Sequence, residues 1–594
     1  MGFPLGMSPQ QLTTQLKNSQ SVAELRRLAE SNGHILSAFH DSVISVVCGR
    51  IGAEDKKTSR GGLQSTTRAE AKALFLTAAA MWLNRPPGAF GRDARSCANI
   101  MHAGAKLGCD ESEPIYRDLL QTSVGMAKEF KAQEASNALW AVATVGCSDA
   151  NIVIPLARSA ITHVSDFTAQ GACNSLWATA TLGLFDESIT VPLARCCVDR
   201  SHDMTAQGAS NCLWSLATLG VTDNSLIIPI AQVCVLHSDG ASLVSQNAAN
   251  SFWAAASLNI QDEGIIKALA ESCVIRVQDM SPQGIVNSIW AAATLRLTDE
   301  NIIVPLALGC VSRAKEFTAQ GAANSFWSVA TLSLTDEAIV LPLARTCVNL
   351  APEFNAQNAA NCLWALATLG LSDRDLFLPI AQACVNKASE MNPQNAANSV
   401  WSAAALEIFD PSIIVPLAQA VHDRHRQLPR LDDARQCLQA HYAGVALSPE
   451  TYSHFCNILR VSAKQASSVS LSQMSVFAAF VRLGYHPRLE MPLYDGLVIC
   501  DIVIEIPDEG SPTGKSKVAV EFDGPTHFLR QVRGVSGVGP VDIQTRIRNT
   551  LIRRSKEFVL LITIPFYDWD LVQGNREKEE EYLLQRLGLD TPDS

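Results

Sequence analysis

The sequence predicts a mostly α-helical chain, an α-solenoid of helix-pair repeats followed by a small α/β domain. Eight of the ten tryptophans recur at a spacing of 37 residues, once 39, which indicates a tandem repeat. They are Trp140, Trp177, Trp214, Trp253, Trp290, Trp327, Trp364 and Trp401. After the array, the pattern of apolar residues becomes typical of β-strands, in "YDGLVICDIVIEI", "KVAVEF" and "FVLLITIP". A single helix pair cannot bury its apolar face alone, so we expect the copies to stack.

Each repeat carries signals for two helices. A Gln lies seven residues before every Trp, an Asn three before and an Asp nine after. N-cap residues precede the first helix at Thr168, Thr205, Ser281, Thr318, Asn355 and Asn392. Residues suited to a left-handed C-cap follow it at Gly146, Gly183, Gly220, Asn259 and Gly370. The recurring Asp is the expected N-cap of the second helix.

Proline occupies one position of the second segment in seven of the eight copies, as in "ESITVPLARCCV" around Pro192. Inside a helix, proline removes a hydrogen bond and crowds the preceding turn. We therefore expect a single turn after the Asp and a main helix that begins at the proline.

Four regions follow from these patterns. Degenerate copies with His102 and Tyr442 at the Trp position flank the array as caps. The regions are 1–94, an N-terminal helical region; 95–445, the repeat solenoid; 446–490, a helical linker; and 491–594, the α/β domain.

Charge and cysteine content narrow the functional classes. The net charge is −11, and residues 131–420 hold 12 basic and 24 acidic side chains, which argues against strong phosphate binding by the array. The 17 cysteines show no zinc-type spacing, and equivalent positions in stacked helices lie too far apart for disulfides. We therefore expect the cysteines to be thiols in the core and the protein to lie in a reducing compartment. Because no apolar run is long enough to span a bilayer, we expect no membrane partner.

A polar stripe is expected on the first helix of each repeat. The Gln, the Asn and the residues one and four after Trp are spaced by 4, 4 and 3, as in Gln320, Asn324, Ser328 and Thr331. One interpretation is a ladder that reads single-stranded RNA; the other is an amide ladder that serves packing alone. The variable position six before Trp adds candidates Asn247, Asn358 and Asn395, although small residues there also suit close packing. The tryptophans are expected in the core.

The segment 530–556 is the best candidate for phosphate contact. It holds seven basic residues against one acidic residue, Asp542; the alternative is an ordinary solvated helix. The seven are Arg530, Arg533, Arg546, Arg548, Arg553, Arg554 and Lys556.

Carboxylates form a second candidate site in the terminal domain. Glu521 and Asp523 alternate on one strand and therefore share a face, with Asp501 on the preceding strand. The three could hold Mg²⁺, with His527 or Lys517 assisting a hydrolytic water. The alternative is a structural cluster without metal.

The repeats, with strings such as "ANCLWALATLG" (360–370), resemble the octotricopeptide and heptatricopeptide repeats of organellar RNA-binding proteins. The strings "VAVEFDGPTHFLR" (518–530), "TRIRNTLIRRS" (545–555) and "LITIPFYDWD" (561–570) resemble a RAP domain, a module of the restriction-endonuclease-like fold. The resemblance implies an RNA-binding factor of mitochondria or plastids, acting in RNA processing, stability, translation or ribosome assembly. Nuclease relatives carry Glu-x-Lys where this chain has Glu521 and Asp523.

Three functions follow. The first is binding of single-stranded or ribosomal RNA without catalysis and without a cofactor. The alternative is a scaffold or ribosomal assembly subunit whose acidic solenoid docks basic ribosomal or ribonucleoprotein proteins. The third is an Mg²⁺-dependent endoribonuclease that acts through the terminal domain.

Overall fold

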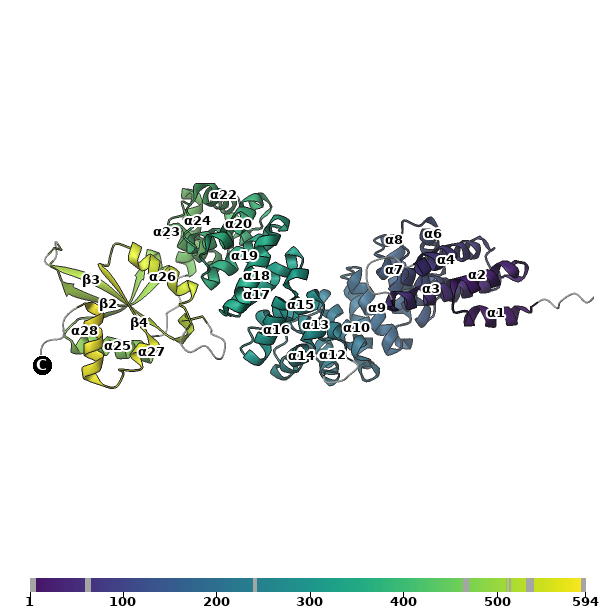
Figure 1. The fold of residues 1–594 in the computed structure, drawn as a ribbon, viewed down its shortest axis with the longest axis horizontal. Helices are drawn as coiled ribbons and strands as arrows, with labels where there is room; N and C mark the ends of the chain where they lie inside the picture. The colour runs from purple at the N-terminus through teal and green to yellow at the C-terminus, as the bar shows by residue number, and fades with distance from the viewer. Residues whose placement is uncertain are drawn as a thin grey trace, which may run out of the picture. The chain divides into compact units, whose positions relative to one another are not determined.

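The computed structural model describes residues 7–58, 66–238, 243–462, 469–508, 510–511, 514–529 and 539–588. Two compact units, Met1–Asp279 and Met280–Ser594, divide the chain inside the repeat array (Figure 1). Among the described residues, no helix combines the length and the apolar character needed to cross a membrane.

The first unit is helical throughout its described elements. Four Trp-marked repeats are the pairs α7/α8, α9/α10, α11/α12 and α13/α14, and α5 carries His102 at the Trp position. The helices are α1 (Pro9–Asn18), α2 (Val22–Ser31), α3 (Ala38–Thr58), α4 (Thr66–Asn84), α5 (Ala94–Leu107), α6 (Pro114–Met126), α7 (Ala132–Val145), α8 (Ala150–Thr162), α9 (Ala169–Thr181), α10 (Glu187–Asp199), α11 (Ala206–Thr218), α12 (Asn224–Leu236), α13 (Ser245–Ser257) and α14 (Glu263–Ile275).

The second unit continues the array and adds a small sheet. Its repeats are the pairs α15/α16, α17/α18, α19/α20 and α21/α22. The helices are α15 (Pro282–Thr294), α16 (Glu300–Arg313), α17 (Ala319–Thr331), α18 (Glu337–Leu350), α19 (Ala356–Leu369), α20 (Arg374–Asn386), α21 (Pro393–Ala405), α22 (Pro411–His422), α23 (Leu431–Tyr442), α24 (Pro449–Ser462), α25 (Leu471–Arg482), α26 (Ile543–Arg554), α27 (Phe566–Trp569) and α28 (Arg576–Leu587).

The predicted helix caps are confirmed. The recurring Asp accepts a backbone hydrogen bond in every repeat, from Asp149 Oδ1 with Asn151 N at 2.9 Å to Asp410 Oδ1 with Ser412 N at 2.9 Å. The left-handed position after the first helix is also present in all eight repeats, although only four copies have glycine there. Asn259, Arg296, Ser333 and Glu407 adopt positive φ in the others.

The expectation that the second helix begins at the proline is wrong. Pro192 is the sixth residue of α10, which runs without interruption from its N-cap Asp186. The carbonyl that the proline leaves without a partner belongs to Ser188, four residues earlier, in the exposed first turn. Water can solvate that carbonyl, so proline this close to an exposed helix start is tolerated.

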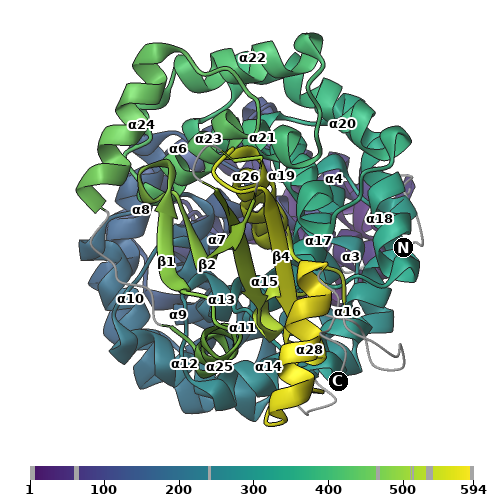
Figure 2. The same ribbon diagram turned by 90° about the vertical axis from the view of Figure 1, so that its left-hand side faces the viewer.

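Small residues set how the repeats stack. In the second unit, α15, α17 and α19 lie on the inside of α16, α18 and α20 (Figure 2). The inner helices meet through fully buried side chains such as Ala322, Ala323 and Ala359, which allow close approach, whereas the outer helices carry bulkier Leu and Ile. Each of the 17 cysteines is a buried free thiol, as expected for core positions.

A four-stranded mixed sheet follows the repeats in the second unit. The strands β1 (Arg488–Leu493), β2 (Val498–Pro507), β3 (Lys515–Asp523) and β4 (Leu560–Pro565) lie in the order β1-β2-β3-β4. The first two pairings are antiparallel, and β3 pairs with β4 in parallel through the crossover helix α26. On one face Val518, Val520 and Phe522 pack with α25 and α28 in a single apolar core. The opposite face therefore presents Glu521 and Asp523 to α26.

Candidate nucleic-acid interface

The exposed stripe of the repeats differs in one position from the predicted one. Every recurring Gln is exposed and every recurring Asn is half-buried, as for Gln320 and Asn324. Ser328, one residue after the Trp, is fully buried and donates its hydroxyl to the Asn324 carbonyl at 2.7 Å. Trp327, and not Ser328, is therefore the third residue of the exposed stripe, and Thr331 is the fourth. The spacing of 4, 3 and 4 keeps these four residues in line along the helix, because it alternates around the 3.6-residue turn.

Seven of the eight recurring tryptophans are half-buried, so the prediction of a core position is wrong for them. Only Trp401 is fully buried. The ring centroids of Trp140 and Trp177 lie 6.4 Å apart, and those of Trp327 and Trp364 are also 6.4 Å apart, with planes tilted by 33° and 35°. Neighbouring repeats thus place partly exposed indoles in a row beside the amides. The spacing from Asn to Trp, three residues, was the sequence signal for this arrangement.

The variable candidates lie away from that surface. Asn247, Asn358 and Asn395 are 6–7% exposed. The Asn247 carbonyl accepts the Ser210 hydroxyl of the preceding repeat at 2.9 Å. The structure therefore places these three side chains between stacked helices, where a ligand does not reach them.

Two grooves of the second unit follow the stripe. The first, about 500 Å³, is lined by Gln283 and Asn287 of α15 and by Gln320 and Asn324 of α17. The second, about 770 Å³, lies between the repeats and the sheet domain. It is lined by Arg296, Thr331, Trp364, Thr368, Gln544, Phe528 and Phe566, among others. Amides, aromatic rings and one guanidinium therefore converge where the stripe meets the domain.

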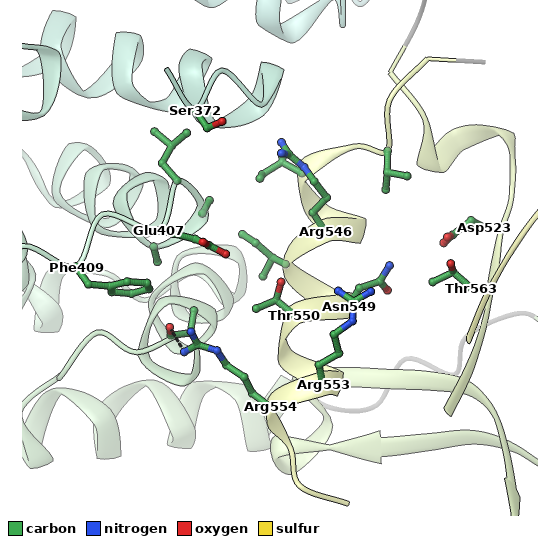
Figure 3. Close-up of a pocket in the computed structure, with 17 residues that line it drawn as sticks. Ser372, Glu407, Phe409, Asp523, Arg546, Asn549, Thr550, Arg553, Arg554 and Thr563 are labelled. Carbon is green, nitrogen blue, oxygen red and sulfur yellow. Dashed lines mark hydrogen bonds between the residues drawn. The ribbon is translucent and has the colours of Figure 1, made fainter. Parts of the chain in front are cut away.

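Two arginines of the basic segment hold α26 against the repeats. Arg546 Nη2 donates to the Ala367 carbonyl at 3.2 Å, near the C-terminus of α19. Arg554 donates to the Ala443 carbonyl at the C-terminus of α23, and its guanidinium lies over the Phe409 ring. Both side chains point from α26 toward the repeats that line a pocket of about 540 Å³ (Figure 3). Helix C-termini leave carbonyls unpaired and carry partial negative charge, which explains the preference for cations there.

The remaining basic candidates have different environments. Arg548 lies on the sheet side of α26, with Nε 2.9 Å from Glu521 Oε2 and Nη2 2.7 Å from Asp523 Oδ1. Arg553 and Lys556 are exposed, and Arg553 lies along α26 beside Asn549 (Figure 3). Arg530 and Arg533 lie outside the described residues. Within the described segment, Arg553 and Lys556 are thus the side chains best placed for a phosphate.

The predicted carboxylates converge, but around an arginine. Asp501 Oδ2 accepts the Phe522 N–H at 2.9 Å, Glu521 Oε1 accepts the Asp501 N–H at 3.0 Å, and Asp523 lies 3.0 Å from His527 Nδ1. The Arg548 guanidinium already supplies the positive charge between Glu521 and Asp523. Across the described residues, these carboxylates do not bring three oxygens within 4.8 Å of one another. The donor set therefore does not fit Mg²⁺, and Lys517 pairs instead with Glu557 at 3.9 Å.

The buried carboxylates make a pH-dependent contribution to stability. Burial raises the pKa of Glu521 to about 8, opposed by Arg548 and reinforced by Asp501. The folded state then keeps a proton that the unfolded chain loses near its ordinary pKa of 4.5. The contribution of Glu521 to stability is consequently greatest below pH 4.5 and falls as the pH rises from there to about 8.

We expect the Glu521→Gln variant to lose this slope, which approaches about 1.4 kcal/mol per pH unit. Hydrogen exchange of β2, β3 and α26 peptides between pH 5 and pH 8, corrected for intrinsic exchange, measures it in the whole chain. An equal slope in wild type and variant would contradict the assignment to Glu521.

Comparison with known proteins gives one family match. Residues 234–427 match the model of a family described as RNA-editing substrate-binding complex 6 protein. This range holds the repeats marked by Trp253, Trp290, Trp327, Trp364 and Trp401. The repeat array is therefore similar to an RNA-related family over about a third of the chain.

Other comparisons are less informative. No curated protein matches the chain at a significant level. Among solved structures, 77% of this chain aligns with 83% of a chain in a homology model of the full-length AP-3 complex in an intermediate open conformation. The identity is 11% and the TM-score is 0.27, so no argument rests on this alignment.

Proposed function

We propose that this protein binds single-stranded RNA along the inner helices of its repeats. The observation that carries the proposal is the row of exposed Gln, half-buried Asn and half-buried Trp side chains, a set that is complete in seven of the eight repeats. Amides can hydrogen-bond to base edges and 2′-hydroxyl groups, and indole rings can stack on bases of any sequence. The similarity of residues 234–427 to an RNA-related family supports the same conclusion.

The acidic character of the array is compatible with this mode of binding. The recurring carboxylates are N-caps of the second helices, such as Asp299 and Asp336, or lie in the turn before the first helix, such as Glu316. The exposed stripe itself carries amides, indoles and hydroxyls in the second unit, as Gln320, Asn324, Trp327 and Thr331 show. Phosphates would then face solvent, with Arg553 and Lys556 available at the sheet domain.

The test is binding of labelled single-stranded RNA to the full chain. Trp327→Ala should weaken binding by about 1–3 kcal/mol, the value of one base-stacking contact. Leu308→Ala is the control, because Leu308 is 47% exposed on the outer helix α16 and lies off the stripe. Equal affinities for wild type and Trp327→Ala would sink the proposal.

Salt dependence separates this mode from phosphate-driven binding. Contacts dominated by amides and stacking should lose little affinity between 50 and 200 mM salt, whereas six or more phosphate contacts would cost about 10³-fold or more. The charge-reversing variant Arg553→Glu should change the salt slope more than Trp327→Ala does. If the affinity of wild type fell steeply with salt and Arg553→Glu left that salt dependence unaltered, the result would contradict the proposal that amides and stacking dominate binding while Arg553 contacts phosphate.

Further parts of the proposal rest on the resemblance to octotricopeptide-repeat and RAP proteins. We place the protein in mitochondria or plastids, in RNA processing, stability, translation or ribosome assembly, without a cofactor. RNA should therefore stay intact during the binding experiment with Mg²⁺ present. Binding of a basic ribosomal protein, with none of RNA, would instead support the scaffold alternative.

A further inference from the structure

Three cysteine sulfurs meet in the core of the first unit. Cys173 lies on α9, Cys197 on α10 and Cys212 on α11. Their Sγ atoms all lie within 4.8 Å of one another, and those of Cys197 and Cys212 are 3.4 Å apart. The side chains are 3%, 0% and 0% exposed. Among the described residues, this is the one group that brings three metal-ligand atoms so close.

The cluster is a departure from the repeat pattern. The Cys197 position, twenty residues after Trp, is cysteine in six repeats, and the Cys212 position faces it from the next repeat. The Cys212 position holds serine in most other copies, namely Ser175, Ser251, Ser288, Ser325 and Ser399. The Cys173 position holds cysteine in no other copy; it holds Ser136, Ser210, Ala249, Val286, Ala323, Ala360 and Ala397. Packing of the repeat therefore does not require these thiols.

A neighbouring glycine leaves room for the third sulfur. A Cβ added to Gly208 would lie 3.3 Å from Cys173 Sγ, which is a tight contact. Four repeats further along the chain, Cys347 and Cys362 occupy the positions of Cys197 and Cys212 and lie next to each other. There the Cys173 position is Ala323 and the Gly208 position is Asn358. Glycine also stands at this position in Gly171, Gly284 and Gly321, where the preceding repeat has Ser136, Ala249 and Val286, so Gly208 leaves room for the sulfur without being particular to the cluster.

We propose that Cys173, Cys197 and Cys212 bind one Cu(I) ion in three-coordinate thiolate geometry. Metal–sulfur bonds of about 2.3 Å place ligand sulfurs about 3.8–4.0 Å apart, within the observed range of 3.4–4.8 Å. Thiolates select soft ions such as Cu(I). Structural zinc needs a fourth ligand, and burial keeps water from supplying it. Each thiol that ionises on binding releases its proton to solvent, and no electron is transferred.

The experiment is anaerobic titration of the full chain with Cu(I) against a chromogenic copper chelator. Wild type should retain one ion per chain, with sulfur ligands at about 2.3 Å by X-ray absorption. Cys173→Ala and Cys212→Ser should each weaken binding by more than about 100-fold, because each removes a direct ligand and not only a residue that supports one. Both substitutions copy residues that other repeats already carry, so circular dichroism should show an unchanged fold.

The control variant is Cys362→Ser, which removes one thiol of the Cys347 pair and should leave copper binding unchanged. The double variant Ala323→Cys/Asn358→Gly should create a second site and raise the stoichiometry to two. Equal copper retention by wild type and Cys173→Ala would overturn the proposal, as would loss of copper in Cys362→Ser. Retention of Zn(II) in preference to Cu(I) would overturn the assignment of the ion.

Discussion

Replacing Arg548 with alanine is expected to destabilise the sheet domain by about 3–5 kcal/mol, the usual cost of removing one partner from a buried ion pair. Glu521 and Asp523 are 0% and 2% exposed, and Arg548 lies within 2.9 Å of both. Without the guanidinium, the Asp523 carboxylate would remain buried next to Asp501 with little compensation, and Glu521, which is protonated below its pKa of about 8, would lose its contact with Arg548. Hydrogen exchange of β3 and α26 peptides in the full chain measures the loss.

Two companion variants separate charge pairing from other effects of the substitution. Arg553→Ala removes an exposed arginine from the same helix and should change stability by no more than about 0.5 kcal/mol. The triple variant Arg548→Met/Glu521→Gln/Asp523→Asn should recover part of the loss, because neutral amides leave no unpaired charge. An Arg548→Ala variant as stable as Arg553→Ala would show that the ion pairs do not support the domain.

Replacing Trp401 with alanine is expected to cost about 3–5 kcal/mol in the stability of the second unit. Trp401 is fully buried, and its Nε1 donates to Gln439 Oε1 of α23 at 2.9 Å. The substitution removes a large core side chain and leaves the Gln439 amide without this partner. Chemical denaturation, with hydrogen exchange of α21 and α23 peptides as the local readout, measures the effect.

Comparison with other tryptophan variants defines the origin of that effect. Trp401→Phe keeps most of the volume and loses the hydrogen bond, so it should cost about 1 kcal/mol plus a small packing loss. Trp327→Ala, at a half-buried position of the same motif, should destabilise clearly less than Trp401→Ala while weakening RNA binding more. Similar destabilisation by both alanine variants would indicate that the stripe tryptophans serve the fold alone.

The local features of the repeats were predictable because they depend on residues close in sequence. A carboxylate such as Asp299 caps the helix that begins one residue later, and a left-handed residue such as Gly370 ends the helix before it. Equally local is the alternation that places Glu521 and Asp523 on one face of β3. Pro192 was misjudged because the consequence of proline depends on whether the freed carbonyl is exposed, which the sequence does not state.

The environment of each side chain was decided by tertiary structure. Trp327 and Trp401 occupy the same position of the motif, but Trp327 is half-buried whereas Trp401 is fully buried. The difference arises because α23, through Gln439, covers Trp401. The basic segment likewise separated into Arg546, which binds the C-terminus of α19, and Arg548, which contacts the buried side chains of Glu521 and Asp523. Periodicity and caps thus determined the helices and their repetition. Which polar, aromatic or charged groups remain available for a ligand depended on which distant elements pack over them.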